Sequence, residues 1–253
     1  MYDLKETSGL SISTDENGKL TFWAELDSID PDVRYKKDMQ DVFYDKNGQG
    51  PDELYYMYRG VGYKEDRELM AKHGLRYDIT VLRSGQIGPE YIKTVGHYHP
   101  LKPGTEVTYP EVYEVLYGTA HYLLQTEPDD DGVDVILVEA KPGDKVLIPP
   151  GYGHITINPG PEVLVMSNWV AYGFDSVYSP IKELGGGAYF ELAAEGEDQR
   201  FIPNPRYKPA PRISLRQVQD HPELGLISGK PMYQEFISSP EKFAFLTQPE
   251  NYF

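Results

Sequence analysis

Cysteine is absent from the 253 residues of this chain, which excludes disulfide bonds and metal sites built from thiolates. Any metal ion that the protein holds must therefore be ligated by histidine and carboxylate side chains. Positive charge is also scarce, because 40 Asp and Glu outnumber 24 Lys and Arg and give a formal net charge of −16. This imbalance argues against nucleic acid or an anionic membrane surface as a partner, since both need cations opposite their phosphates.

Long hydrophobic runs, a secretion signal and internal repeats are missing as well. No apolar run approaches the length of a membrane span. The first residues, MYDLKETSGL, lack the basic and then apolar order of a secretion signal. Hydrophobic residues still make up 40% of the chain, which is enough for a sizeable core. We expect a soluble, cytoplasmic protein that binds neither nucleic acid nor membrane.

The middle of the chain is a series of short apolar segments separated by Gly, Pro, Asn and Asp. Many short strands at this spacing, with no helices between them, predict an all-β sandwich or barrel rather than a parallel α/β sheet. The segments are YDITVLRSG, YIKTVGHYH, EVYEVLYG, HYLLQT, VDVILVEA, DKVLIPPG, HITINPG and EVLVMSNWV.

The flanking regions are more mixed. Aromatic and β-branched residues predict strands, and capping residues predict helices. The predicted strands are residues 19–26 and 53–61, and the predicted helices are residues 30–43, 64–74 and 239–246. Residues 213–253 show no obvious chemistry and are expected to form a surface-packing tail or a dimer arm.

Two of the six histidines, His97 and His99, stand one residue apart in GHYHP. Alternate residues of an extended strand point to the same side, so this pair offers two imidazole nitrogens to one point. Such an arrangement suits a metal ion. A glutamate, either Glu106 or Glu111, and His154 are further candidate ligands, because a barrel brings distant strands together at its mouth.

The spacing of these residues resembles the two cupin motifs. The first motif ends with a Glu, six residues and a Gly, which Glu111 and Gly118 match. The gap from His99 to Glu111 is longer than usual, and PLKPGTEVTYP has the composition of an inserted loop. The second motif, G-x5-P-x-G-x2-H-x3-N, is complete in Gly143, Pro149, Gly151, His154 and Asn158.

Longer segments resemble the cupin-type (archaeal-type) glucose-6-phosphate isomerases. The likeness covers roughly residues 35–207. It implies a cupin double-stranded β-helix, or jelly-roll, barrel over residues 77–207, with short helices and extensions at 1–76, whose strands join the barrel, and at 208–253. The resembling segments are TVGHYH (94–99), PEVYEVLYG (110–118), LLQT (123–126), PPGYGHITINPG (149–160) and NPRY (204–207).

The resemblance implies one divalent metal ion per subunit, held by His97, His99, Glu111 and His154. Glu106 is the rival to Glu111, because it follows His99 at the separation found in shorter family members. Glu111 is preferred since the residues around it match the family and those around Glu106 do not. Iron(II) is expected first, and manganese, nickel or zinc are alternatives.

The same resemblance implies an aldose–ketose isomerase that interconverts glucose 6-phosphate and fructose 6-phosphate, as a homodimer. Glu111 and Tyr113 are candidates for proton transfer. Thr80, Thr94 and Gly96 are expected near the phosphate of the sugar, and Tyr152 and Tyr178 are expected to cover the pocket.

One segment departs from the family pattern. Residues 168–178, NWVAYGFDSVY, contain no histidine where many family members have one, and Trp169 replaces the first aromatic residue. A different sugar phosphate, such as mannose 6-phosphate, therefore stays open as the substrate. Two other classes stay open as well: another metal-dependent cupin enzyme, such as a dioxygenase or decarboxylase, and a non-catalytic sugar-binding cupin.

Overall fold

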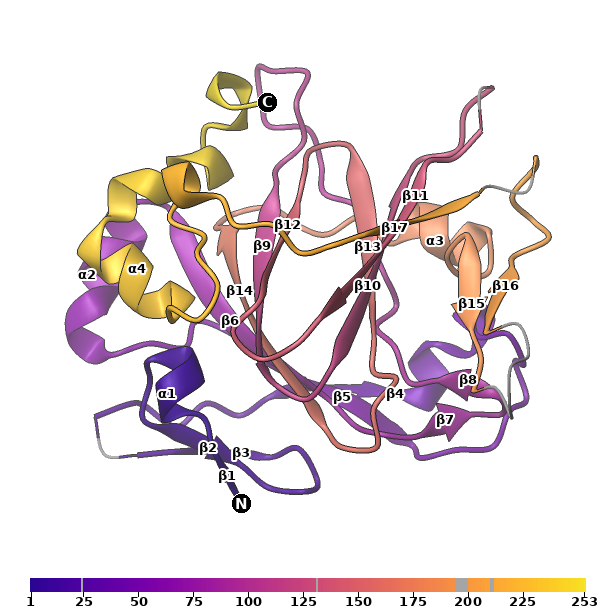
Figure 1. Cartoon of the computed structure of the whole chain (residues 1–253), viewed down its shortest axis with the longest axis horizontal. Helices are drawn as coiled ribbons and strands as arrows, with labels where there is room; N and C mark the ends of the chain where they lie inside the picture. Colours follow the sequence, from indigo (N-terminus) through magenta and orange to yellow (C-terminus); the bar gives the residue numbers. More distant parts are fainter. Residues whose placement is uncertain (24, 131, 194–199, 210–211) are drawn as a thin grey trace.

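The computed structural model describes residues 1–23, 25–130, 132–193, 200–209 and 212–253. Two β-sheets lie at its centre and enclose a large apolar core, to which both sheets contribute buried side chains such as Val115, Leu124, Ile155 and Met166. Short helices and hairpins surround the sheets (Figure 1). The prediction of a mainly β, cupin-type barrel is confirmed.

The larger sheet has six antiparallel strands in the order β12-β9-β14-β6-β5-β4. Every residue of β14 is buried. Its two faces contribute to two different cores, so apolar residues occupy successive positions of the strand, interrupted by Ser167 and Asn168. The strands are β4 Asp32–Tyr35, β5 Glu53–Tyr58, β6 Leu75–Leu82, β9 Glu111–Tyr117, β12 Lys145–Ile148 and β14 Leu164–Ala171.

The smaller sheet has four strands in the order β13-β10-β11-β17. Its β-branched and leucine-rich segments fit a pleated, buried surface. The last pair, β11 with β17, is parallel, and the other pairs are antiparallel. The strands are β10 Ala120–Thr126, β11 Val135–Ala140, β13 Tyr152–Ile157 and β17 Ile213–Arg216.

Smaller elements complete the described part of the chain. No helix among them is long and apolar enough to cross a membrane. The short strands are β1 Tyr2–Asp3, β2 Ile12–Thr14, β3 Leu20–Phe22, β7 Gln86–Ile87, β8 Glu90–Tyr91, β15 Tyr189–Glu191 and β16 Phe201–Pro203. The α-helices are α1 Lys5–Ser8, α2 Arg67–Lys72, α3 Ser179–Glu183 and α4 Met232–Ser238. The 3-10 helices are η1 Lys36–Asp38, η2 Gln40–Val42, η3 Lys64–Asp66, η4 Pro222–Leu224, η5 Pro240–Leu246 and η6 Pro249–Asn251.

The C-terminal segment, residues 222–253, covers the outer face of the larger sheet next to β6 and β14 (Figure 1). Trp169 of β14 is fully buried there, with its ring 4.2 Å from that of Phe236 and 4.9 Å from that of Tyr77. The backbone N–H of Met232 also donates to Glu114 Oε2 of β9 at 2.8 Å. The segment expected to be a surface-packing tail or a dimer arm therefore packs on the sheet of its own chain and closes a second core.

Two predicted elements are wrong. The helix over residues 30–43 is replaced by β4 and two turns of 3-10 helix, because Val33 and Arg34 pair with β5, and the edge of this sheet offers the hydrogen bonds that a helix would have made. The strand over residues 91–99 is largely absent, since after β8 only isolated bridges form. Gly96 has a φ of +81°, outside the extended region, and this interrupts a regular strand.

Two strands from the first 76 residues, β4 and β5, extend the sheet that begins with β6. They place residues from the N-terminal part of the chain beside the barrel mouth. The division into segments 1–76, 77–207 and 208–253 stays a prediction.

Candidate metal centre

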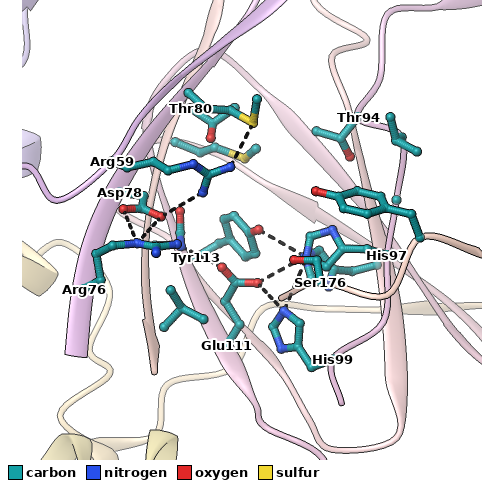
Figure 2. Close-up of a pocket in the computed structure, with 18 of the residues that line it drawn as sticks. Arg59, Arg76, Asp78, Thr80, Thr94, His97, His99, Glu111, Tyr113 and Ser176 are labelled. Carbon is teal, nitrogen blue, oxygen red and sulfur yellow. Dashed lines mark hydrogen bonds and ion pairs between the residues drawn. The ribbon is translucent and has the colours of Figure 1, made fainter. Parts of the chain in front are cut away.

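Three imidazoles and one carboxylate converge at the mouth of the barrel. One ligand atom from each of His97, His99, Glu111 and His154 lies within 4.8 Å of the others. The Nε2 atoms of His97 and His99 are 3.2 Å apart, and Glu111 Oε2 lies 3.2 Å from His154 Nε2 and 3.4 Å from His99 Nε2. Figure 2 shows His97, His99 and Glu111 turned toward one another.

Backbone pairing brings these residues together from distant parts of the chain. His97 and His154 form an isolated antiparallel bridge, with N–H···O distances of 3.3 and 3.0 Å in the two directions. Gly96 is required beside it, because a Cβ there would lie 2.3 Å from the side chain of Ile155 and its φ is positive. Glu111 begins β9, so the carboxylate and the histidines meet where two sheets end.

Hydrogen bonds from outside the cluster orient its donor atoms. The Nδ1 atom of His99 lies 2.9 Å from the carbonyl oxygen of Tyr109. Because a carbonyl only accepts, Nδ1 carries the proton and Nε2 presents its lone pair to the cluster. Asn168 Nδ2 donates to Glu111 Oε1 at 2.6 Å, which leaves Oε2 as the oxygen that faces the histidines.

The charges of the cluster match a divalent cation. Burial lowers the pKa of His97 well below its usual value and lowers that of His154, so both imidazoles are neutral near pH 7. Burial opposes ionisation of Glu111, but the nearby imidazoles of His154 and His99 outweigh it and lower the pKa of this carboxyl. Three neutral nitrogens and one carboxylate leave a bound divalent ion with net positive charge.

Two observations show that these residues fit a metal ion. Glu111 Oε2 is buried and makes no hydrogen bond within the described part of the chain. The two imidazole nitrogens of His97 and His99 approach each other to 3.2 Å, where a lone pair needs a cation or a proton opposite it. A buried carboxylate oxygen without a hydrogen bond and imidazole nitrogens that face one another are the donors that a divalent transition metal takes.

Tyr113 lies two residues after Glu111 on the same face of β9. Its hydroxyl is 3.0 Å from His154 Nε2. Burial, and then the negative charge of Glu111, raise the pKa of Tyr113 well above its usual value, so the hydroxyl stays protonated. It can therefore donate a hydrogen bond or a proton inside the pocket.

The pocket extends beyond the cluster and contains about 700 Å³ of space, its open mouth included. Of the residues predicted to handle the substrate, Thr80, Thr94, Gly96 and Tyr178 line it together with Tyr113. Tyr178 is next to the cluster, with its ring 5.3 Å from that of His97.

The structure does not bring two other predicted residues to this pocket. Tyr152 is absent from the pocket lining, and its hydroxyl donates to Asp134 instead. Glu106 is exposed in the loop before β9 and lies outside the cluster that Glu111 joins. Trp169 points to the outer core, so segment 168–178 contributes two other aromatic residues to the pocket lining, Tyr178 and Phe174, the latter with its ring 4.8 Å from that of His99.

Sequence reasoning missed four polar residues of the pocket lining, which are Arg59, Arg76, Asp78 and Asn168. The signal for part of this group was present, because Arg76, Asp78 and Thr80 alternate along β6 and must share one face. Which face looks into the pocket follows only from the pairing of β6 with β5 and β14.

The fold and this cluster define the chain as a cupin with a candidate metal centre of three histidines and one glutamate. Comparison with known protein families then identifies the particular family to which the chain belongs. The sequence model of the family described as glucose-6-phosphate isomerase (GPI) matches residues 34–208, and the chain belongs to this family.

Curated relatives agree with the family. A protein named glucose-6-phosphate isomerase from Thermococcus gammatolerans is 30% identical over 179 residues, which are 69% of this chain and 86% of that protein. Its namesake from Pyrococcus furiosus is 29% identical over 182 residues, 70% of this chain and 87% of that protein. Among solved structures, an oxalate oxidase with a bound substrate analogue overlaps 43% of this chain and 47% of its own, with 17% identity and a TM-score of 0.33.

Proposed function

We propose that this chain is a metal-dependent aldose–ketose isomerase that interconverts glucose 6-phosphate and fructose 6-phosphate through the open-chain sugar. One observation carries the proposal: His97, His99, Glu111 and His154 converge in a pocket of a chain that belongs to the glucose-6-phosphate isomerase family. The curated relatives that match most of the chain carry the name of this activity.

The four converging residues are the proposed metal ligands. When bound, a divalent ion supplies Lewis-acid chemistry, the polarisation of the sugar oxygens at carbons 1 and 2. The protein holds the ligand atoms in place through Asn168 and the carbonyl of Tyr109, so little reorganisation is needed at the moment of reaction.

The remaining task is to move a proton between carbon 2 and carbon 1. We assign this role to Glu111, whose ionised carboxylate faces the pocket, with the hydroxyl of Tyr113 as the neighbouring donor. A direct hydride shift between the two carbons is the rival route and needs no base. The two routes differ in whether hydrogen from the solvent enters the product.

The phosphate of the sugar is assigned to Thr80, Thr94 and the backbone N–H of Gly96, with Tyr178 covering the pocket. Their lining of one pocket with the metal ligands supports this assignment. The Thr94 hydroxyl already accepts the N–H of Thr156 at 3.0 Å, so its own proton is available to a ligand. Tyr152, the first residue of β13, is absent from the pocket lining, and its covering role stays a prediction.

Iron(II), a homodimer and a cytoplasmic location complete the proposal. A set of three imidazoles and one carboxylate suits iron(II), and also manganese, nickel and zinc. The outer strand β17 leaves one edge of the smaller sheet without a partner strand in the described part of the chain, and Leu215 on it is 73% exposed. Such an edge supports pairing with a second subunit.

Mannose 6-phosphate is a second candidate substrate. The segment 168–178 has no histidine, and it places Phe174 and Ser176 in the pocket lining. An apolar ring and a small hydroxyl discriminate less strictly between sugars that differ at carbon 2.

The direct test is reconstitution of the metal-free chain with iron(II), manganese, nickel or zinc, followed by an assay for conversion of fructose 6-phosphate to glucose 6-phosphate. Mannose 6-phosphate formation and oxygen consumption are measured in the same samples. Glu111→Ala should abolish metal binding and activity, whereas the matched control Glu106→Ala should retain both. Equal damage by the two substitutions, or oxygen consumption without isomerisation, would overturn the proposal.

A further inference from the structure

Two arginines share one buried carboxylate on the wall of the pocket that lies opposite His97 (Figure 2). Arg76 Nε lies 2.9 Å from both oxygens of Asp78, and Arg59 Nη1 lies 3.4 Å from Asp78 Oδ2. Arg59 also donates from Nε to Asp32 at 3.1 Å. Asp78 is only 4% exposed, so its charge is compensated by these guanidinium groups rather than by water.

The register of the larger sheet directs this group into the pocket. Arg76, Asp78 and Thr80 alternate on β6, so they share one face of the sheet. Met57 of β5 pairs with Thr80, and Arg59 follows two residues later on the same face. Thr80 is one of the residues assigned to the sugar phosphate. The two arginines therefore lie on the same face of the sheet as a residue of the proposed phosphate site.

The negative net charge of the molecule explains why binding of an anionic ligand would need these arginines. The chain has a net charge of −16 and repels anions at long range. Within the described lining of the pocket, Arg59 and Arg76 are the side chains with a permanent positive charge. The assigned phosphate partners Thr80, Thr94 and Gly96 carry no charge, whereas a phosphate monoester carries about −2 near pH 7.

The hydrogen bonds of Arg76 leave donors for a ligand. Its Nε is committed to Asp78, and its terminal nitrogens make no hydrogen bond to any residue that the structure describes. A guanidinium fixed through Nε presents the rest of its planar fork in a defined direction, which suits two oxygens of one phosphate. The Arg76 side chain is 27% exposed, so the fork is accessible from the pocket.

We propose that Arg76 and Arg59 are the charged part of the phosphate site, that Asp78 is a positioning residue which fixes both guanidinium planes, and that the group selects phosphorylated over unphosphorylated sugars. This inference rests on the proposed function for the identity of the sugar, but not for the recognition of a phosphate. The alternative is a purely structural ion pair that fastens the end of β5 to β6.

The experiment compares Arg76→Met and Arg59→Met with wild type, using fructose 6-phosphate, fructose and inorganic phosphate as probes. Because a hydrogen bond to a charged group contributes about 1.5–3 kcal/mol, we expect Arg76→Met to raise the KM for fructose 6-phosphate about 10- to 100-fold with little change in kcat. The Kd for inorganic phosphate, measured by calorimetry, should weaken by a similar factor. The value of kcat/KM for fructose should stay near that of wild type.

Three controls separate recognition from structure. Arg67→Met removes an exposed arginine that pairs with Asp27 and does not line the pocket, and it should change none of these values. Arg76→Lys keeps the charge without the fork and should restore part of the phosphate affinity. Thermal denaturation and metal content should match wild type in every variant that is interpreted.

The inference is overturned if Arg76→Met binds phosphate as wild type does, or if it loses activity equally on fructose and fructose 6-phosphate. Failure of the proposed function gives a different result. In that case wild type loaded with metal converts no sugar phosphate, while calorimetry with inorganic phosphate and fructose 6-phosphate still decides whether the arginines bind the anion.

Discussion

Asn168 donates a hydrogen bond of 2.6 Å to Glu111, from the centre of one strand to the first residue of its neighbour. The bond engages Oε1 and leaves Oε2 directed at His99 and His154. Partners of this kind fix a ligand before the metal arrives, and their loss typically weakens metal affinity 10- to 100-fold.

Asn168→Leu is therefore expected to weaken the affinity for the divalent ion by about 10- to 100-fold without removing a ligand. The measurement is competition with a chelator of known affinity, which needs no activity assay. Asn251→Leu, on an exposed residue of the C-terminal turn, is the matched control. An unchanged affinity in Asn168→Leu would show that Glu111 needs no such support.

Tyr113→Phe tests the proton donor of the proposed reaction. A positioned acid or base contributes typically 10²- to 10⁴-fold, so kcat should fall by about this factor while the metal content is retained. Tyr122→Phe is a close control, because the two rings are 5.4 Å apart and both are buried, while the Tyr122 hydroxyl contacts Met166 rather than a candidate ligand. A similar loss in both variants would point to packing instead of chemistry.

Solvent exchange separates proton transfer from hydride shift. With Glu111 as the base, isomerisation in heavy water should place deuterium on the product, because the transferred proton exchanges with solvent while it is on the carboxylate. The measurement is the deuterium content of glucose 6-phosphate by mass spectrometry after partial conversion. A product without deuterium would favour the hydride route and leave Glu111 as a ligand only.

The ion pair of Glu114 and Lys145 predicts a pH-dependent stability. Both side chains are buried, and Lys145 Nζ lies 2.8 Å from Glu114 Oε1. Burial raises the pKa of Glu114 to about 7 against the opposing effect of Lys145. A folded-state pKa above the unfolded one means that this carboxyl favours folding at low pH and that the favourable contribution is lost as pH rises through the folded-state pKa.

Lys145→Met should therefore destabilise the protein by about 3–5 kcal/mol near pH 8, where an uncompensated carboxylate is left buried, and by less near pH 5. Urea unfolding at the two pH values measures the difference. Lys141→Met, on an exposed residue of the neighbouring turn, should be nearly neutral at both. A deficit that is equal at both pH values would contradict the raised pKa of Glu114.

The C-terminal segment is expected to contribute directly to stability. Phe236 is fully buried against Trp169, so Phe236→Ala should lower the free energy of unfolding by about 3–5 kcal/mol. Phe253→Ala, at a ring that is 49% exposed, should change it little. If unfolding of Phe236→Ala matches wild type, the segment is a detachable tail after all.

Some of the site could be predicted from the sequence because its pattern is local. The motif around His154 spans only sixteen residues. Asn158 at its end stabilises the turn by donating hydrogen bonds to the carbonyl oxygens of Arg83 and Glu162 at 3.1 and 2.8 Å. The H-x-H pair is local in the same way. Because such short spacings determine which side chains lie on the same side of a strand or turn, the candidate ligands could be predicted from the sequence alone.

The group of Arg59, Arg76 and Asp78 on the pocket wall could not be predicted from the sequence, for a physical reason. Arg59 and Arg76 are separated by helix α2, and nothing in the sequence states that β5 pairs with β6 in the register that brings both to Asp78. The wrong helix over residues 30–43 has the same cause, since β4 exists only because β5 offers it an edge. Interactions that depend on long-range register are invisible to local periodicity.

The two tryptophans of the chain have opposite surroundings: Trp23 is 54% exposed, whereas Trp169 is fully buried one residue after Asn168. The indole of Trp169 packs against the apolar C-terminal segment, whereas the amide of Asn168 supports the Glu111 carboxylate in the pocket. Blue-shifted tryptophan fluorescence should thus come from Trp169 alone. A change in its emission wavelength on adding sugar or metal ion would show, without any label, that binding inside the barrel affects the packing on its outer face.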